Sequence, residues 1–154
     1  MWAKVEKKGL RGSSPARIDD KGRLKVPTIF RGLVHDQAGP DIYVTSLTGE
    51  CVRVYPMQTW LQIEQKVLAT PGSHPSLGKF MDRMNFYGSA GELDPQGRFV
   101  ISPLLREHAA IVGEVYVLGR INHLEVWNVD RLNAKLQREP WTDNDGLLLA
   151  QFGI

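Results

Sequence analysis

Two short segments of the chain carry the same pair of charged residues at the same spacing. The first is IDDKGR at residues 18–23, and the second is LDPQGR at residues 93–98. An arginine can form bidentate hydrogen bonds to a phosphate or a guanine edge, whereas an aspartate repels polyanions and commonly stabilises a turn. We therefore predict that the aspartates and glycines shape two loops and that the arginines can face a ligand. The residues concerned are Asp19, Gly22 and Arg23 in the first segment and Asp94, Gly97 and Arg98 in the second.

The first of these two segments is the more basic. Arg17, Lys21 and Lys25 surround Arg23, whereas Arg98 has no such neighbours. Residues 1–36 contain nine Lys and Arg against four Asp and Glu, and residues 37–154 contain ten against thirteen. Lysines commonly make phosphate contacts that carry no sequence information. We predict that Arg17, Lys21, Arg23 and Lys25 contact a polyanion such as a nucleic acid and that Arg98 either assists them or has an architectural role.

The sequence offers little support for catalysis. Cys51 is the single cysteine, and the four histidines show no zinc-ligand spacing with it. Neither a phosphate-binding P-loop nor a dinucleotide-binding glycine pattern is present. His35 precedes Asp36, but no nucleophile accompanies this pair at a recognised spacing. We expect no enzyme activity, no metal, no cofactor and no small-molecule substrate.

Length and composition indicate a soluble globular protein. The 154 residues are 42% hydrophobic and 23% charged, enough for one domain or two tightly joined halves. No segment approaches the roughly 18 apolar residues needed to cross a membrane, and the basic N-terminus has no apolar run of a signal peptide. We therefore expect a cytoplasmic protein without membrane contact.

The two charged segments are expected to form hairpins that are each followed by a short helix. Strand alternation turns Ile18, Leu24 and Val26 toward the core in the first copy and Leu93, Phe99 and Ile101 in the second. A proline suits the first turn of a helix. Pro27 is thus expected to begin a helix that runs to about residue 34, and Pro103 its counterpart.

The remaining pattern predicts further strands and helices. We expect strands at 42–46, 51–55, 115–118 and 123–127, and helices at 58–69, 76–86 and 129–137. Trp60, Trp127 and Tyr55 are interpreted as core or interface aromatics. The tail at 140–154 has an acidic turn and an apolar end, so it could pack on its own chain, dock on a neighbouring subunit, or fray.

The similarity between the two halves extends beyond the hairpins. When Asp19 is aligned with Asp94, Arg31 falls on Arg106 without a gap, and the shared pattern is D-x-x-G-R-x-x-[VI]-x-x-x-[FL]-R. Arg31 and Arg106 suit ion pairing or subunit contact, and we interpret them as structural. A repeat this short cannot bury its apolar face alone, so the copies should pack together. We predict a first repeat at 10–70, a linker helix at 71–86, a second repeat at 87–139 and a tail at 140–154.

The segments RIDDKGRLKVPTIFR and ELDPQGRFVISPLLR, with the flanking LRGSS, VYVLG and LEVWN, strongly resemble the MraZ family. These are bacterial DNA-binding regulators built from two AbrB/MazE-like swapped-hairpin units, also called SpoVT-AbrB-like units. The resemblance implies an α+β fold with a compact β-barrel made of two intertwined repeats, and assembly into a ring-shaped homo-oligomer. It also implies a nucleoid-associated regulator that binds repeated boxes in double-stranded promoter DNA of the division and cell wall gene cluster.

Two other functions stay open at this point. An antitoxin-like or scaffold protein could use the same fold for protein interaction and grip a partner through its apolar tail. A small hydrolase would need an activity that disappears on His35→Ala, and we expect none.

Overall fold

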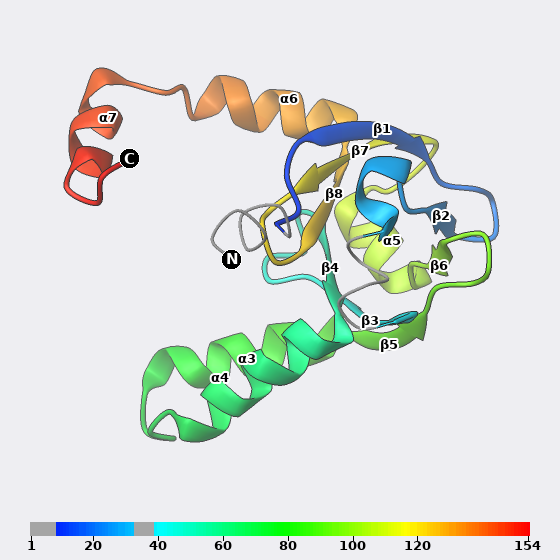
Figure 1. Ribbon diagram of the computed structural model, residues 1–154, viewed down its shortest axis with the longest axis horizontal. Helices are drawn as coiled ribbons and strands as arrows, with labels where there is room; N and C mark the ends of the chain where they lie inside the picture. Colours follow the sequence, from blue (N-terminus) through cyan, green and yellow to red (C-terminus); the bar gives the residue numbers. More distant parts are fainter. Residues whose placement is uncertain (1–8, 33–38) are drawn as a thin grey trace.

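The computed structural model describes residues 9–32 and 39–154, which form a mixed α+β fold with antiparallel strands (Figure 1). The strands of the first half are β1 (Ser13–Arg17), β2 (Arg23–Lys25), β3 (Asp41–Thr45) and β4 (Val52–Pro56). Those of the second half are β5 (Ser89–Glu92), β6 (Arg98–Val100), β7 (Glu114–Gly119) and β8 (Leu124–Asn128). The helices are α3 (Met57–Ala69), α4 (Pro75–Phe86), α5 (Pro103–Ala109), α6 (Val129–Arg138) and α7 (Asp143–Ala150), and residues 28–32 are also helical.

Most strand pairs join one half of the chain to the other. A six-stranded sheet has the order β1-β7-β8-β4-β3-β5, and β2 pairs with β6 in a separate two-stranded ribbon. Only the β3–β4 and β7–β8 pairs stay within one half. Within the described residues the larger sheet is open, with β1 and β5 as its outer strands, so the expectation of a closed barrel was wrong.

The two hairpins also differ from expectation in where their arms pair. The predicted turns are present, because Gly22 N–H donates to the Asp19 carbonyl and Gly97 N–H to the Asp94 carbonyl. Beyond the first turn, however, only an isolated bridge between Ile18 and Leu24 joins the two arms. β1 extends along β7, and β2 extends along β6. Backbone hydrogen-bonding capacity is equally satisfied by either partner, so local alternation could not reveal this choice.

The main core lies on one face of the six-stranded sheet. All six side chains predicted to point inward from the hairpins are buried there: Ile18, Leu24, Val26, Leu93, Phe99 and Ile101. They pack against alternate residues of the central strands, such as Val52 and Val126. The opposite face of the sheet carries α6 on one side and the base of α3 on the other. Trp60 of α3 stacks on Tyr43 with 4.4 Å between the ring centroids.

The helices begin where their local sequence predicts. Ser102 caps α5 and Asn128 caps α6, each by accepting a hydrogen bond from a backbone N–H of the first turn. Pro75 and Pro103 occupy the first helical turns of α4 and α5, where a missing N–H has no cost. The helices predicted at 58–69, 76–86 and 129–137 are confirmed as α3, α4 and α6. The turn between α3 and α4 makes them a helical hairpin that projects from the body (Figure 1).

The tail forms a helix, and three arrangements had been open for it at the level of sequence. Thr142 and Asp145 make a capping box at the start of α7, with hydrogen bonds in both directions. None of the residues of α7 is buried.

Some expectations concern residues that lie outside the described ranges. The described ranges do not include His35, Asp36, the end of the helix after Pro27 or the lysines of the first eight residues.

In the described part of the chain, no helix combines the length and apolar composition that crossing a bilayer requires.

Candidate nucleic-acid interface

The two Asp-x-x-x-Arg loops have the same hydrogen-bond geometry. Asp19 Oδ1 accepts from the backbone N–H of Lys21 at 3.0 Å and of Arg23 at 2.8 Å. Its Oδ2 accepts from Arg23 Nε at 2.8 Å. Each carboxylate therefore fixes both the turn and the side chain of its own arginine.

The second loop makes the same three contacts at nearly the same distances. Asp94 Oδ1 accepts from the backbone N–H of Gln96 at 2.9 Å and of Arg98 at 2.8 Å, and Oδ2 accepts from Arg98 Nε at 2.8 Å. Both aspartates have a lowered pKa, mainly because the backbone N–H of the arginine bonds to the charged carboxylate. Each aspartate bonds only to the Nε of its arginine. The two Nη groups of the guanidinium take no part in this ion pair.

Each loop requires a glycine, both because its φ angle is positive and because a Cβ would have no room. Gly22 has φ +80° and Gly97 has φ +77°, a region that other residues rarely adopt. A Cβ at Gly22 would lie 2.7 Å from the Arg106 guanidinium carbon, and one at Gly97 would lie 2.6 Å from Arg31 Nε. Each glycine thus lets an arginine from the opposite half pack against the loop.

This packing gives Arg31 and Arg106 the structural role that was predicted for them. Arg31 Nη2 donates to the Gln96 carbonyl at 2.7 Å, across 65 residues of sequence. Arg106 Nε donates to the Ile101 carbonyl at 3.0 Å and lies against Gly22. The two halves therefore hold each other's loops.

The β2–β6 ribbon brings the two loops into one surface. In its register Lys25 lies opposite Arg98, Arg23 opposite Val100, and Leu24 opposite Phe99. Leu24 and Phe99 are buried, so alternation places the other four side chains on the outer face. Backbone bonds from Val26 N–H to the Gly97 carbonyl and from Ile101 N–H to the Gly22 carbonyl, both 2.9 Å long, extend the ribbon at its ends.

The predicted cations differ in how close they lie to this ribbon. Arg23, Lys25 and Arg98 share its outer face. Lys21 is exposed in the turn that precedes β2. Arg17 is at the end of β1, mostly exposed, with its Nη1 4.0 Å from Glu114 across the strand pair. Such a surface ion pair contributes little to stability, so Arg17 can exchange partners.

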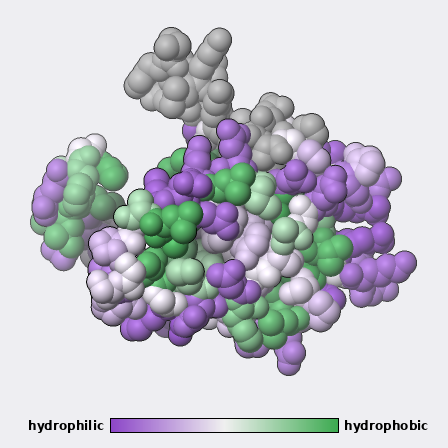
Figure 2. All heavy atoms as spheres, turned by 90° about the horizontal axis from the view of Figure 1, so that it is seen from below, coloured by the Kyte–Doolittle hydropathy of each residue, from purple (hydrophilic) through white to green (hydrophobic). Residues whose placement is uncertain are grey.

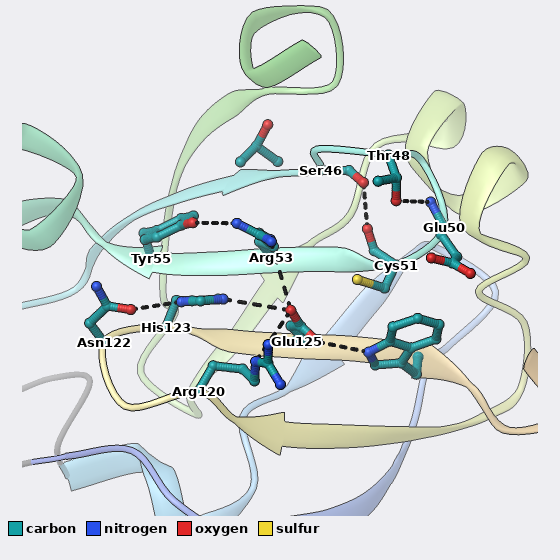
Figure 3. Close-up of polar contacts among 12 residues, drawn as sticks. Ser46, Thr48, Glu50, Cys51, Arg53, Tyr55, Arg120, Asn122, His123 and Glu125 are labelled. Atoms are coloured by element: carbon teal, nitrogen blue, oxygen red, sulfur yellow. Dashed lines mark hydrogen bonds and ion pairs between the residues drawn. The ribbon is translucent and has the colours of Figure 1, made fainter. Parts of the chain in front are cut away.

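Sequence reasoning missed a second polar cluster, which lies on the opposite face of the sheet between α3 and α6. Glu125 on β8 is at its centre in Figure 3, where it faces Arg53 of β4 and Arg120 and His123 of the β7–β8 turn. Its Oε2 lies 3.8 Å from Arg53 Nε, 3.6 Å from Arg120 Nε and 3.7 Å from His123 Nε2. Trp127 Nε1 donates to its Oε1 at 3.0 Å.

The environment of Glu125 keeps its carboxylate charged. Burial alone would raise its pKa, but His123, the Trp127 N–H and the two arginines outweigh this and lower the pKa to about 2. Because Arg53 pairs with Glu125 across strands from the two halves, the cluster ties the halves together on this face. Alternation along LEVWN placed Glu125 beside Trp127, but only the β4–β8 register could identify Arg53 as its partner.

The buried cysteine shows no sign of reactivity. Burial is the main cause that raises the pKa of the Cys51 thiol, to about 12, so the thiol is protonated at neutral pH. Within residues 9–32 and 39–154, no group of three or more His, Cys, Asp or Glu side chains is arranged to hold a metal ion.

Comparison with known proteins connects this geometry to one family. The family profile described as "MraZ protein, putative antitoxin-like" matches residues 10–80 and 89–145. A protein of Acidobacterium capsulatum is 40% identical over 144 residues, which cover 94% of this chain and 99% of the relative. A protein of Koribacter versatilis is 43% identical over 145 residues, again with 94% and 99% covered. Both relatives carry the name "Transcriptional regulator MraZ".

Proposed function

Because the chain belongs to the MraZ family, we propose that it is a sequence-specific DNA-binding transcriptional regulator. Its proposed target is promoter DNA of the division and cell wall gene cluster, with repeated boxes bound by a ring-shaped homo-oligomer. The names of the relatives support the regulatory role. The β2–β6 ribbon supports the mode of binding.

The observation that carries this proposal is the pair of like charges across the ribbon. Lys25 and Arg98 lie directly opposite each other, with Arg23 on the same face. Like charges at such positions destabilise a strand pair. A polyanion that binds the outer face would relieve this repulsion, and a two-stranded ribbon is narrow enough to enter a major groove.

The loops would supply arginines that are already oriented before DNA binds. Asp19 and Asp94 hold Nε of Arg23 and Arg98 at 2.8 Å, which limits the rotamers of both side chains. Less side-chain entropy is then lost on binding. The Nη groups can bond guanine O6 and N7, while Lys21, Lys25 and Arg17 can meet phosphates. In this arrangement Arg98 assists Arg23 on the same surface.

The identical loops also support the proposed repeat organisation. We assign the first swapped-hairpin unit to 10–70 and the second to 87–139, joined by a linker helix at 71–86 and followed by the tail. Each half gives its first strand to the sheet edge of the other half, as β1 beside β7 and β5 beside β3. A regulator of this kind would act in the cytoplasm, at the nucleoid.

The test is fluorescence-anisotropy titration with promoter DNA from upstream of the division and cell wall cluster and a scrambled duplex of equal length. Arg23→Ala should weaken binding to the promoter duplex by roughly 10- to 100-fold, the effect of about 1–3 kcal/mol expected for one base-reading arginine. Arg138→Ala is the matched control, because Arg138 is an exposed arginine on α6. Equal affinity of folded Arg23→Ala and wild type, or equal binding of both duplexes, would refute the proposal.

One observation keeps an antitoxin-like interaction module as a second candidate function. The α7 helix leaves large apolar side chains exposed, among them Leu147 and Leu148. A module of this type would hold a different protein through the tail. It predicts that such a protein co-purifies with the full chain and is lost when residues 140–154 are deleted.

A further inference from the structure

The C-terminal segment forms an arm that its own chain does not cover. We define the arm as residues 139–154, from the end of α6 through α7 to the C-terminus. Figure 1 shows α7 apart from the body, and in Figure 2 the arm stands at the left with green apolar atoms on its surface. Five large apolar side chains of the arm are 50–82% exposed: Trp141, Leu147, Leu148, Phe152 and Ile154.

The arm has a defined shape despite its exposure. The Thr142–Asp145 capping box fixes the start of α7, Leu147 and Leu148 lie in its last turn, and Phe152 lies in the turn that follows the helix. An isolated helix of eight residues is marginal in water. The start of α7 is capped, but its apolar side chains are exposed to solvent. We therefore expect α7 to be stabilised by packing against a partner.

The chain also carries an apolar groove without a filling element. It lies between α3 and α4, has a volume of about 340 Å³, and is lined by Trp60, Ile63, Leu68, Phe80, Met81 and Met84, among others. Leu68 and Met81 are exposed at its mouth. The groove and the arm are on separate projections of the same molecule, and no residue of α7 is buried in its own chain.

The apolar surface of the arm is large enough for a stable protein interface. An aromatic side chain can bury ~150–250 Å², so the arm offers on the order of 600–800 Å² of apolar area. A stable interface takes about 800 Å² from each partner, whereas a monomer rarely leaves a patch above roughly 600 Å² in water.

Charge favours a contact between these two surfaces over a contact of either with itself. The arm has Glu139, Asp143 and Asp145 and no lysine or arginine. The α3–α4 hairpin has Lys66, Lys79 and Arg83 against Glu64 and Asp82. Two arms placed together would repel each other, whereas an arm beside the hairpin meets a small positive excess.

We propose that the arm of one copy docks in the α3–α4 groove of a second copy of this chain. Leu148 of α7 and Phe152 of the turn that follows it enter the groove as apolar anchors, beside Leu68 and Met81. The contact is heterologous, so each copy gives one arm and receives another, and a ring closes when every groove is filled. This inference rests on the homo-oligomer in the proposed function and identifies the surfaces that build it.

The test uses full-length variants and measures mass in solution by light scattering after size exclusion. Leu148→Glu with Phe152→Glu disables the arm, and Leu68→Glu with Met81→Glu disables the groove. Leu61→Glu is the matched control, because Leu61 is exposed on α3 outside the groove. Far-UV circular dichroism checks that each variant is folded.

We expect wild type and Leu61→Glu to have the same mass, a multiple of 17.3 kDa. Each double variant alone should fall to 17.3 kDa. An equimolar mixture of the two double variants should form a two-chain species, because one intact arm still meets one intact groove. A monomeric wild type, double variants of unchanged mass, or a mixture that stays monomeric would each overturn the proposal.

DNA binding separates a failure of this inference from a failure of the proposed function. A duplex with one box should bind the monomeric arm variant, and Arg23→Ala should weaken this binding. A duplex with repeated boxes should bind the arm variant at least tenfold more weakly than wild type. If Arg23→Ala leaves the affinity for the single-box duplex unchanged, the proposed function is refuted, whereas the proposed assembly is not. If the arm variant keeps the wild-type mass but loses a co-purifying protein, the arm belongs to a different partner and the inference fails.

Discussion

At the scale of single residues, the same side chain serves the fold and the proposed function. Asp19 bonds two backbone N–H groups of its turn and the Nε of Arg23. The prediction that aspartate stabilises the loop and the prediction that arginine faces a ligand are therefore compatible, because the ion pair uses one edge of the guanidinium. Glu125 has a comparable role on the opposite face of the sheet, where no ligand is proposed.

Asp19→Ala should destabilise the first loop and leave Arg23 less well oriented. We expect the midpoint of thermal unfolding to fall by about 2–4 °C, the usual result of losing one capping interaction in a protein of this size. Promoter affinity should also fall, but less than in Arg23→Ala. Asp20→Ala, in the same turn and exposed, is the control for stability and should leave the midpoint unchanged. Calorimetry and anisotropy would measure both effects, and an unchanged midpoint would contradict the structural role of Asp19.

Glu125→Gln should remove a source of stability that depends on pH. The pKa of Glu125 is lowered from 4.5 to about 2 in the folded protein, so its charge stabilises the fold above about pH 4.5, and this contribution is lost as the pH falls toward 2. We expect the variant to lose about 2 kcal/mol of unfolding free energy at pH 7. Urea titrations from pH 7 to pH 2 should show this difference shrinking below pH 4.5. Glu114→Gln changes an exposed carboxylate and serves as the control; a difference independent of pH would argue against the mechanism.

At the scale of elements, the β2–β6 ribbon determines what the charged residues can do together. Its register puts Lys25 opposite Arg98 and leaves Val100 exposed opposite Arg23. The two motifs are 75 positions apart in sequence, yet they form one face. Both loops thus belong to one surface, and a DNA molecule bound to that surface would lie beside both.

Val100→Lys should add a fourth cation to the outer face of the ribbon. We expect tighter DNA binding at low salt, with a similar fold-gain for promoter and scrambled DNA, because phosphate contacts carry no sequence information. The slope of log affinity against log salt should steepen by about 0.9 for one added phosphate contact. Gln62→Lys on the exposed side of α3 adds the same charge elsewhere and should leave the slope unchanged. An unchanged slope in Val100→Lys would mean that the ribbon does not face DNA.

At the scale of the whole molecule, the two halves depend on each other. β1 pairs with β7, β2 with β6, β3 with β5 and β4 with β8, and Arg31 and Arg106 pack against the opposite loops. The core on one face of the sheet contains side chains of both halves, such as Phe30 and Leu105. Neither half has a complete sheet or core of its own.

A fragment that ends in the turn between α3 and α4 should therefore not fold alone. We expect residues 1–72 to show a disordered amide spectrum by NMR and to gain dispersed signals when residues 73–154 are added. Cleavage of the intact protein in the same turn should leave the two pieces associated on size exclusion, because the strand pairs between the halves remain. A folded isolated fragment would contradict the mutual dependence of the halves.

Short stretches of the sequence were enough to predict the local structure and to propose the residues of the candidate interface. Pro103 predicted the start of α5, the sequence pattern predicted α3, α4 and α6, strand alternation identified the inward residues of both hairpins, and the Asp-x-x-x-Arg spacing identified the loops. These features depend on backbone preferences and on contacts within a few residues, which a short stretch of sequence contains.

How these pieces combine follows only from the contacts between the two halves. The partner of β2, the open sheet in place of a barrel, the Glu125 cluster and the meeting of Lys25 with Arg98 all depend on which strands pair across the halves. A strand's backbone groups accept any partner of suitable register, so alternation cannot choose between them. The choice follows from burying one shared core, which is a property of both halves together.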